Sequence, residues 1–590
     1  MSTKHLNITF WLGVFFLGVL VFTIYSPAIN GEWLWDDDDL VSHNLVLRTA
    51  GGLKDIWLNP RSTQQYYPLT FTVFWMQYQA WGLAASGYHL INILLHVLNA
   101  ILVWQVFRRL NVKGAFAVAA IFAVHPVCVE TVAWISELKN LLSGLFYLLA
   151  LLFYLHYDDV AADDQQTQAK QKWFVLSLLC FTLALLSKTT AATLAPVLVL
   201  LSWWKGKRSV KRIIKNVIPF FLLGILAGGV TLWCEKVFVG ARGEFWQYTF
   251  WERLMIAGRA LWFYPSKIVW PVKLSFFYEL WPVHINGLKS YLPILSFAIV
   301  LMALFLLRKR IGRGPFTAVA FYAVTIFPAL GFFDIETMRY SFVADHYQYF
   351  ASLGWISLIV AGGYRLLARR IQTRLFLSGI TAFIVIAGAL AFSSYHQSRI
   401  YQSRFALYKD VLEKNPGSWM AYNNLGCLYS RQGRYQEAAA NFSKTLQIDP
   451  ESSLAYYNRA IANLNLRRYD AAVSDAASAI KIKPSAQAFE LRGFIYFQQG
   501  LLQKALREYD LCLRLDPDFS EGLAVRGEIY AALGLHDAAL KDLSRLLVKN
   551  PEYCRAYQLR ASIYQTQKES GKVETEKQRA RQFGCGWDDL

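Results

Sequence analysis

Apolar runs separated by short polar loops fill the first 395 of the 590 residues, and they constrain the fold more than any other feature. A helix needs roughly 20 mostly apolar residues to cross the hydrocarbon core of a bilayer. Charged residues make up 17% of the chain, below the roughly 25% of ordinary soluble proteins. We therefore predict eleven transmembrane helices, at about 9–25, 88–107, 114–128, 140–157, 173–187, 190–204, 216–234, 291–307, 316–333, 350–368 and 375–394.

The basic residues argue against nucleic acid as a partner, although the net charge is +19. They cluster at 108–109, 205–215, 308–313 and 365–374, and each cluster adjoins the end of an apolar run. This arrangement is the positive-inside pattern of membrane proteins rather than a nucleic-acid-binding face. It predicts an inner N-terminus, an outer first loop at 26–87, and an outer location for everything after residue 395.

The C-terminal part carries an internal repeat. Prolines at 416, 450, 484, 517 and 551 are 34, 34, 33 and 34 residues apart, the period of tetratricopeptide repeats. The fold class we predict is all-α. A polytopic membrane domain of about eleven helices at 1–395 is followed by a linker helix at 396–418. An α-solenoid at 419–590 then contains four repeats and capping helices. Such solenoids bind extended peptides in a concave groove.

The seven cysteines lack CxxC spacing, so neither a zinc site nor a disulfide framework is expected. Cys427, Cys512 and Cys554 occupy helical positions of the repeats. We expect them to be core residues without a redox role.

Unusual polar residues gather on the predicted outer face. The first loop holds the run Asp36 to Asp39, and later loops add carboxylates, cations and aromatic residues. The members are Asp36, Asp37, Asp38, Tyr67, His125, Glu130, Glu137, Lys139, Lys188, Arg253, Arg259, Arg339, Asp345 and His346. Cations there can hold a lipid-linked phosphate, and a carboxylate can deprotonate an acceptor hydroxyl. Singly, these residues have structural explanations: His125 can cap a helix, and Lys188 can extend to the membrane surface.

The order of these motifs resembles the TMTC group, the transmembrane and tetratricopeptide-repeat-containing O-mannosyltransferases with their bacterial relatives. The matching segments are Trp35-Asp36-Asp37-Asp38, Tyr67-Pro68-Leu69-Thr70, Gly87-Tyr88-His89-Leu90 with Asn92, Leu95-His96 with Asn99, His125-Pro126-Val127 with Glu130, Val132-Ala133-Trp134, Ser136-Glu137, Leu186-Ser187-Lys188, Glu252-Arg253 and Ala344-Asp345-His346-Tyr347. The resemblance implies a GT-C glycosyltransferase fold and an inverting reaction. It also implies a polyprenyl- or dolichyl-phosphate-linked sugar donor, a protein hydroxyl acceptor, and a first-loop aspartate as the base.

On this interpretation the catalytic residues are Asp36, Asp37 and Glu130, with Asp36 or Asp37 as the base. Glu130 or Glu137 positions the acceptor or a metal. The remaining outer-face residues bind substrate. Metal ligands are unknown and no cofactor is certain, with a divalent cation possible. The partners are the lipid-linked sugar, a protein acceptor held by the repeats, and membrane lipid. The membrane is a bacterial inner membrane with periplasmic repeats, or the endoplasmic reticulum with luminal repeats.

Two other functions compete with this interpretation. A membrane-anchored scaffold would use the repeats without catalysis, and it would not need so many outer-face ionisable groups. A transporter of lipid-linked glycans would place its polar groups near the bilayer midplane rather than on one face.

Overall fold

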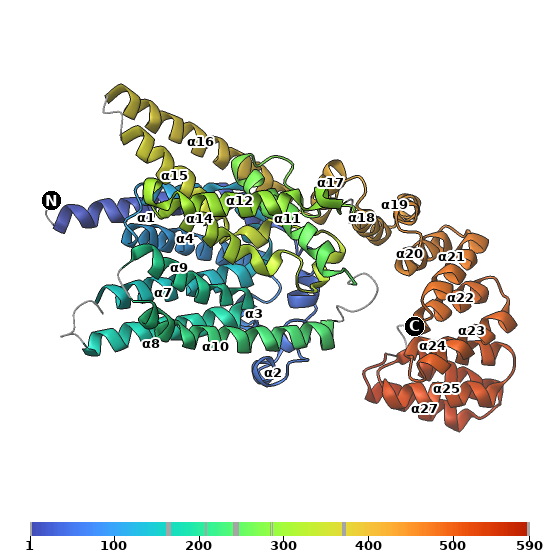
Figure 1. The fold of residues 1–590 in the computed structure, drawn as a ribbon. Helices are drawn as coiled ribbons and strands as arrows, with labels where there is room; N and C mark the ends of the chain where they lie inside the picture. The colour runs from blue at the N-terminus through green and yellow to red at the C-terminus, as the bar shows by residue number, and fades with distance from the viewer. Residues whose placement is uncertain are drawn as a thin grey trace. The chain divides into compact units, whose positions relative to one another are not determined.

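The computed structural model describes residues 3–160, 167–206, 209–239, 247–283, 285, 287–368 and 373–586, and these residues form helices and loops without a strand. The chain divides after Pro416 into two compact units, 1–416 and 417–590 (Figure 1). The helical fold class predicted from the sequence is confirmed.

Each of the eleven predicted spans contains a helix. They are α1 (Thr3–Tyr25), α4 (Ala85–Arg109), α5 (Ala115–Val124), α7 (Leu138–Val160), α8 (Thr167–Ser187), α9 (Leu194–Lys205), α10 (Val210–Cys234), α12 (Leu292–Leu306), α14 (Gly314–Ile326), α15 (Ser352–Ala368) and α16 (Thr373–Ile400). Within the described ranges, seven helices are long and apolar enough to cross a membrane. An eighth crossing results if α5 and the segment Pro126–Ala133, bent by 59°, count as one span. Three helices, α9, α14 and α15, are shorter, at 12, 13 and 17 residues.

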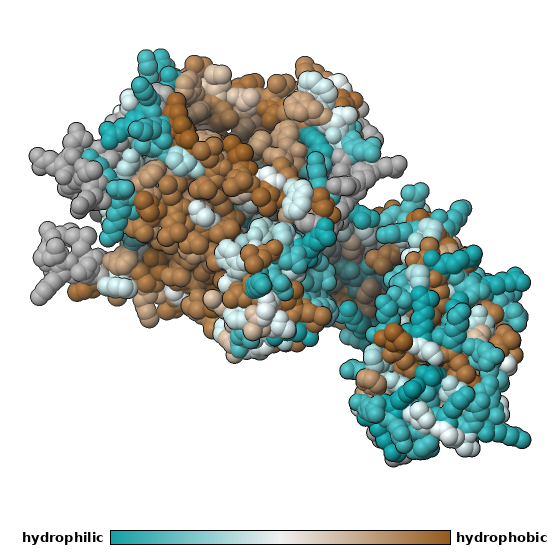
Figure 2. Space-filling model, turned by 90° about the horizontal axis from the view of Figure 1, so that it is seen from below, coloured by the Kyte–Doolittle hydropathy of each residue, from teal (hydrophilic) through white to brown (hydrophobic). Residues whose placement is uncertain are grey.

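The two ends of this helical bundle differ in chemistry. Asp159, at the end of α7, lies 3.0 Å from Arg109 and 3.4 Å from Lys205, so the C-terminal ends of α4, α7 and α9 meet. Lys188, just after α8, instead lies beside Glu137, just before α7. The predicted active-site residues Glu137 and Lys188 are therefore at the opposite end of α7 from Arg109 and Lys205. Hydrophobic side chains dominate the surface of the membrane unit between its polar ends (Figure 2).

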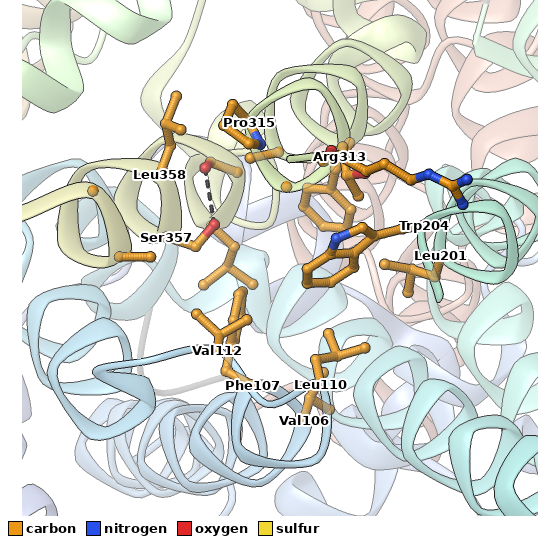
Figure 3. Close-up of a pocket in the computed structure, with 18 of the residues that line it drawn as sticks. Val106, Phe107, Leu110, Val112, Leu201, Trp204, Arg313, Pro315, Ser357 and Leu358 are labelled. Carbon is orange, nitrogen blue, oxygen red and sulfur yellow. Dashed lines mark hydrogen bonds between the residues drawn. The ribbon is translucent and has the colours of Figure 1, made fainter. Parts of the chain in front are cut away.

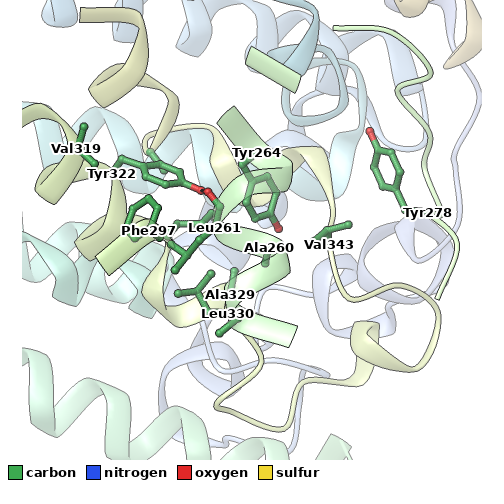
Figure 4. Close-up of a cluster of buried hydrophobic side chains, with 13 residues drawn as sticks. Ala260, Leu261, Tyr264, Tyr278, Phe297, Val319, Tyr322, Ala329, Leu330 and Val343 are labelled. Atoms are coloured by element: carbon green, nitrogen blue, oxygen red, sulfur yellow. Dashed lines mark hydrogen bonds between the residues drawn. The ribbon is translucent and has the colours of Figure 1, made fainter. Parts of the chain in front are cut away.

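A further long helix lies in the stretch 235–290, which we expect to lie along the membrane interface or to dip into it. Helix α11 (Phe250–Val269) begins with a capping box, in which Thr249 and Glu252 satisfy each other's backbone N–H groups. It packs against α12, α14 and α15 through a buried aromatic and aliphatic cluster (Figure 4). Within this cluster the Tyr322 hydroxyl donates a hydrogen bond to the Leu261 carbonyl at 2.9 Å.

The end of the membrane unit lies later than the predicted boundary at residue 395. Helix α16 runs on to Ile400, and α17 (Arg404–Lys414) belongs to the first unit. Arg404 fixes α17 to the first loop, because its Nη2 atom lies 2.8 and 2.7 Å from the two carboxylate oxygens of Asp38. Most of the stretch predicted as a linker is thus part of the membrane unit.

The second unit is a series of helix pairs. They are α18 (Trp419–Arg431) with α19 (Tyr435–Ile448), α20 (Ser453–Asn465) with α21 (Tyr469–Ile482), α22 (Ala486–Gln498) with α23 (Leu502–Leu515), α24 (Ser520–Ala532) with α25 (His536–Lys549), and α26 (Cys554–Thr566) with α27 (Ser570–Gln582). Prolines 450, 484, 517 and 551 stand two residues beyond α19, α21, α23 and α25, where a proline cannot interrupt the helix.

Four of the pairs share a half-buried ion pair between their two helices, and its residues are always 16 apart. The pairs are Arg459–Asp475, Arg492–Glu508, Arg526–Asp542 and Arg560–Glu576. The first pair has Leu425 and Asn441 at these positions. This recurring contact fixes the register of one helix against the other in each of the four pairs.

The expectation for Cys554 is wrong, because Cys554 and Cys585 form a disulfide. The two cysteines are 31 residues apart, and no CxxC motif marks them. They meet because α26 and α27 pack together and return the chain to the start of α26. The five free cysteines of the described residues include Cys427 and Cys512, which fit the expected core role.

Candidate active site

The candidate site is built on short helical turns, broken at His125 and Trp134, at one end of the bundle, and polar residues of the span α4 hold that backbone. Asn92 donates to the Trp134 carbonyl at 2.9 Å, and Asn99 donates to the Leu141 carbonyl at 3.0 Å. His96 lies 3.1 Å from the Ala123 carbonyl through Nε2. These three side chains are buried on one helical face, spaced four and three residues apart. Irregular backbone at this depth needs such internal partners.

Asp37 joins the first loop to this backbone. Its Oδ2 accepts a hydrogen bond from the Leu34 N–H at 2.7 Å, and its Oδ1 accepts two, from the Ser136 N–H and hydroxyl at 2.8 and 2.5 Å. The side chain is fully buried. Burial, followed by the charge of Asp36, raises the pKa of Asp37 to about 8, while the Ser136 and Leu34 donors oppose that rise. Both oxygens of Asp37 are therefore engaged in holding the loop.

Asp36 differs from Asp37 in one respect that matters for chemistry. Its Oδ1 atom is buried and has no hydrogen-bond partner among the described residues. Burial raises the pKa of Asp36, and the nearby charge of Lys139 opposes that rise most. A buried carboxylate oxygen without a donor is suited to accepting a proton from an incoming hydroxyl.

Glu137 gathers two lysines around one carboxylate. Its Oε1 lies 3.3 Å from the Lys139 Nζ, and its Oε2 lies 3.6 Å from the Lys188 Nζ. Asn140 donates to Glu137 Oε2, and also donates to the His346 carbonyl at 2.9 Å. Exposure is 0% for Glu137, 8% for Lys139 and 9% for Lys188. Two cations thus share the Glu137 carboxylate, and their ammonium groups are donors of the kind that bind phosphate.

Glu130 binds the late loop, 216 residues further along the chain. Its Oε1 lies 2.8 Å from His346 Nδ1, and its Oε2 accepts the Asp345 N–H at 3.0 Å. The Asp345 carboxylate accepts from the Tyr278 hydroxyl at 2.9 Å and from the Gln348 amide at 3.2 Å. Burial, and next the Glu130 charge, raises the pKa of Asp345 to about 8.

A small pocket of about 40 Å³ lies directly beside this network. Its polar lining includes Asn140, Lys188 and His346, and its walls include the aromatic residues Tyr147, Tyr347, Tyr349 and Phe350. A pocket of this volume has room for only a few water molecules, so its cations and aromatic rings can form the edge of a site for an anionic, ring-containing ligand but cannot enclose one.

Several predicted site residues lie in other contacts. His125 caps the bent span by accepting the Val127 N–H, and its Nε2 is 3.0 Å from the Ile268 carbonyl. Arg253 pairs with Asp334 at 2.6 Å and donates to the Gly331 carbonyl at 2.8 Å. Arg259 donates to the Pro282 carbonyl at 3.0 Å, and Arg339 ends a short helical turn with an exposed side chain.

Two other predicted residues flank the network. Asp38 is paired with Arg404 and also accepts the Ser42 hydroxyl at 2.9 Å. Tyr67 is buried at the start of α3 (Pro68–Trp81), and Lys139 and Glu137 lie near enough to affect its electrostatics. The roles assigned to these residues from the sequence remain predictions.

Sequence reasoning missed three residues that complete the site. Ser136 supplies two donors to Asp37, Tyr278 holds Asp345, and Arg404 holds Asp38. Ser136 stands next to Glu137 in a motif already noted, whereas Tyr278 and Arg404 carry no local signal. No three histidine, cysteine or carboxylate side chains of the described residues are arranged to hold a metal ion. A divalent cation therefore stays a prediction.

Comparison with known proteins defines the class to which this fold and site correspond. A family model described as dolichyl-phosphate-mannose-protein mannosyltransferase matches residues 68–233, which include Glu130, Glu137 and Lys188. A tetratricopeptide-repeat model matches within 406–553. The chain is thus a multi-pass membrane protein that carries tetratricopeptide repeats, and part of its membrane unit is similar to the mannosyltransferases that this family model describes.

Particular relatives make the resemblance more specific. The chain is 23% identical over 424 residues to Protein O-mannosyl-transferase F38B6.6 of Caenorhabditis elegans, covering 68% of this chain and 58% of that protein. It is 32% identical over 187 residues to Protein O-mannosyl-transferase Tmtc1 of Drosophila melanogaster, covering 30% and 21%. It is 27% identical over 202 residues to human Protein O-mannosyl-transferase TMTC4, covering 30% and 27%. The resemblance to the TMTC group is confirmed, and the chain spans less than two thirds of the length of these relatives.

Part of the chain also aligns with solved structures. The structure titled "Crystal structure of YrrB: a TPR protein with an unusual peptide-binding site" aligns with a TM-score of 0.27 at 19% identity, covering 30% of this chain and 91% of that one.

Proposed function

We propose that the protein is a membrane glycosyltransferase that moves a sugar from a polyprenyl- or dolichyl-phosphate carrier to hydroxyl groups of proteins, with mannose as the first candidate. The observation that supports this most is the unpartnered oxygen of Asp36 beside the Glu137–Lys139–Lys188 cluster. A base next to buried cations is what transfer from a phosphate-linked donor requires.

The proposed reaction is a single displacement that inverts the anomeric carbon. The serine or threonine oxygen of the acceptor bonds to that carbon as the bond from carbon to the phosphate oxygen breaks. The electron pair of the broken bond stays with the phosphate, and the hydroxyl proton passes to Asp36. The phosphate gains one negative charge in this step. Lys139 and Lys188 would stabilise that charge more strongly in the transition state than in the bound donor.

The other buried carboxylates would position the reacting groups. Glu137 holds both lysines, and Glu130 fixes the loop that carries His346 into the wall of the pocket. Asp37 would hold the Asp36 backbone by its contacts with Ser136 and Leu34.

We place the reaction at the outer or luminal face, with the repeats binding the acceptor on the same side. The Cys554–Cys585 disulfide supports this orientation, because disulfides persist in oxidising compartments such as the periplasm and the endoplasmic reticulum lumen. Of these two, the bacterial inner membrane with periplasmic repeats is the location we favour.

The test uses the full chain in detergent with polyprenyl-phosphate-linked mannose, glucose or N-acetylglucosamine and a serine- and threonine-rich protein. Mass spectrometry should show addition of a hexose or an N-acetylhexosamine, according to the donor, that an Asp36→Asn variant does not produce. A parallel reaction in EDTA tests the divalent cation. No addition with any of these sugars, while the protein remains folded, would contradict the proposal.

A further inference from the structure

An apolar cavity of about 400 Å³ lies inside the membrane unit, between α4, α7, α9, α14 and α15. Figure 3 shows aliphatic and aromatic side chains around it, among them Val106, Leu201, Trp204 and Leu358. Its volume is within the range of small-molecule sites, which is roughly 300–1,000 Å³.

Two of the few hydroxyl groups that line this cavity already bond to backbone carbonyls. The Ser357 hydroxyl donates to the Gly354 carbonyl at 3.0 Å, and the Thr317 hydroxyl donates to the Arg313 carbonyl at 2.9 Å (Figure 3). Water needs two to four polar partners in a buried site, and an apolar cavity stays dry. The cavity is therefore suited to a hydrocarbon chain.

The cavity is separated from the catalytic pocket by two aromatic rings. Tyr147 and Phe350 line both spaces, and their rings stack at 5.5 Å with an angle of 14° between their planes. Gly144 makes room for this packing, because a Cβ atom there would collide with the Phe350 ring. A chain bound from the catalytic side would have to displace this pair.

Two arginines stand at the opposite, exposed end of the cavity. Arg313 donates to the Trp203 carbonyl at 2.8 Å and lies over the Trp203 ring at 5.2 Å. Arg365 donates to the Ile311 carbonyl at 3.0 Å. Both side chains are exposed, and Figure 3 shows the Arg313 guanidinium directed away from the apolar residues. A guanidinium has five N–H donors, so each arginine can also bind a phosphate.

We infer that this cavity binds an anionic phospholipid, with one acyl chain inside and the phosphate between Arg313 and Arg365. Charge complementarity favours an anionic headgroup, since Arg308, Lys309 and Arg310 immediately precede the mouth. Basic pockets between membrane helices are typical sites for such headgroups. The site is distinct from the donor site, because it opens at the other end of the bundle and does not depend on the proposed transfer.

The experiment uses the delipidated full chain with phosphatidylglycerol, phosphatidylcholine or undecaprenyl phosphate. Native mass spectrometry should show one retained phosphatidylglycerol, and the Tm should rise by a few degrees with that lipid only. The double variant Arg313→Gln/Arg365→Gln and the cavity-filling variant Ala361→Phe should each lose the bound lipid and the Tm rise. Lys54→Gln, which changes an exposed cation of the first loop far from the cavity lining, should keep both.

Three results would overturn the inference. Equal retention of phosphatidylcholine would show that the anionic charge of the headgroup does not contribute to binding. Loss of bound undecaprenyl phosphate in the Ala361→Phe variant would assign the cavity to the tail of the donor. Unchanged phosphatidylglycerol binding in both the arginine variant and the filled variant would place that lipid elsewhere on the protein.

Discussion

Replacing Asp36 and Asp37 separately by asparagine should give opposite phenotypes, although the two residues are adjacent. Asp36→Asn removes a carboxylate whose Oδ1 has no described partner, so it should leave the fold intact. Loss of a general base costs about 10²–10⁴ in rate, which corresponds to roughly 3–5 kcal/mol of activation free energy. Transfer should fall by that factor.

Asp37→Asn acts on stability instead. The carboxylate accepts three hydrogen bonds, from Leu34 and from Ser136, at 2.5–2.8 Å. An asparagine has only one oxygen, so its NH₂ group must face a former donor. A buried donor left without an acceptor costs about 1–3 kcal/mol. The Tm of this variant should fall, and any loss of transfer should follow the loss of folded protein.

The assay measures both quantities on the same preparations. Initial transfer rates are determined with labelled donor lipid, and the Tm is followed for each full-length variant in detergent. Asp39→Asn is the matched control, because its side chain is exposed and should change neither quantity. If Asp36→Asn transfers sugar at a near-normal rate while a folded Asp37→Asn does not, Asp36 is not the base, and the reasoning from its unpartnered oxygen is wrong.

Four further predictions follow from particular contacts. Lys188→Met should raise the apparent KM for the donor by roughly ten- to a hundredfold, the effect of losing a charge-assisted hydrogen bond to phosphate, whereas Arg259→Met should not; equal effects would contradict the role of Lys188. The transfer rate should fall as the pH drops through the pKa of Asp36, because a base must be unprotonated. Burial raises that pKa, so the rate should begin to fall above the pH at which an ordinary aspartate titrates. Measuring kcat/KM from pH 4 to 8 would show whether it does. Cys585→Ser should cost roughly 3–4 kcal/mol of stability through the opened 31-residue loop, and limited proteolysis should then cut near α27 first while transfer to a short peptide persists. Asn92→Leu should lower the Tm and the transfer rate together, because it leaves the Trp134 carbonyl unpaired beside Ser136 and Glu137; full activity would show that this contact is dispensable.

The fold could be predicted from the sequence where one local pattern determines one element. Apolar runs gave the positions of the membrane helices, and proline spacing gave the helix pairs of the repeats. The boundary at residue 395 was less accurate, because α16 continues through polar residues to Ile400. The Cys554–Cys585 bond was missed for a similar reason, since only the packing of α26 on α27 brings the two cysteines together.

The candidate site was predictable as a set of residues but not as a geometry. Membrane topology places Asp36, Glu137 and Lys188 at one end of the bundle, and the structure brings their charges together. The same topology argument also included Arg253 and Arg259, yet both bind backbone carbonyls of other loops. Hydropathy determines the membrane face on which a residue lies, whereas its lateral position depends on how the helices pack.

The span α4 shows how membrane packing produces the candidate site. Asn92, His96 and Asn99 are buried polar residues in an apolar helix, where each would cost free energy without a partner. Their partners are carbonyls of Ala123, Trp134 and Leu141, which bracket the bent chain of short helical turns around Glu130 and Glu137. That backbone could not lie at the edge of the membrane unless its carbonyls were satisfied internally. The polar face of α4 therefore supplies the hydrogen-bond donors that the segment with the proposed active-site carboxylates needs. A substitution that alters the path of this segment would require a matching substitution on that face of α4.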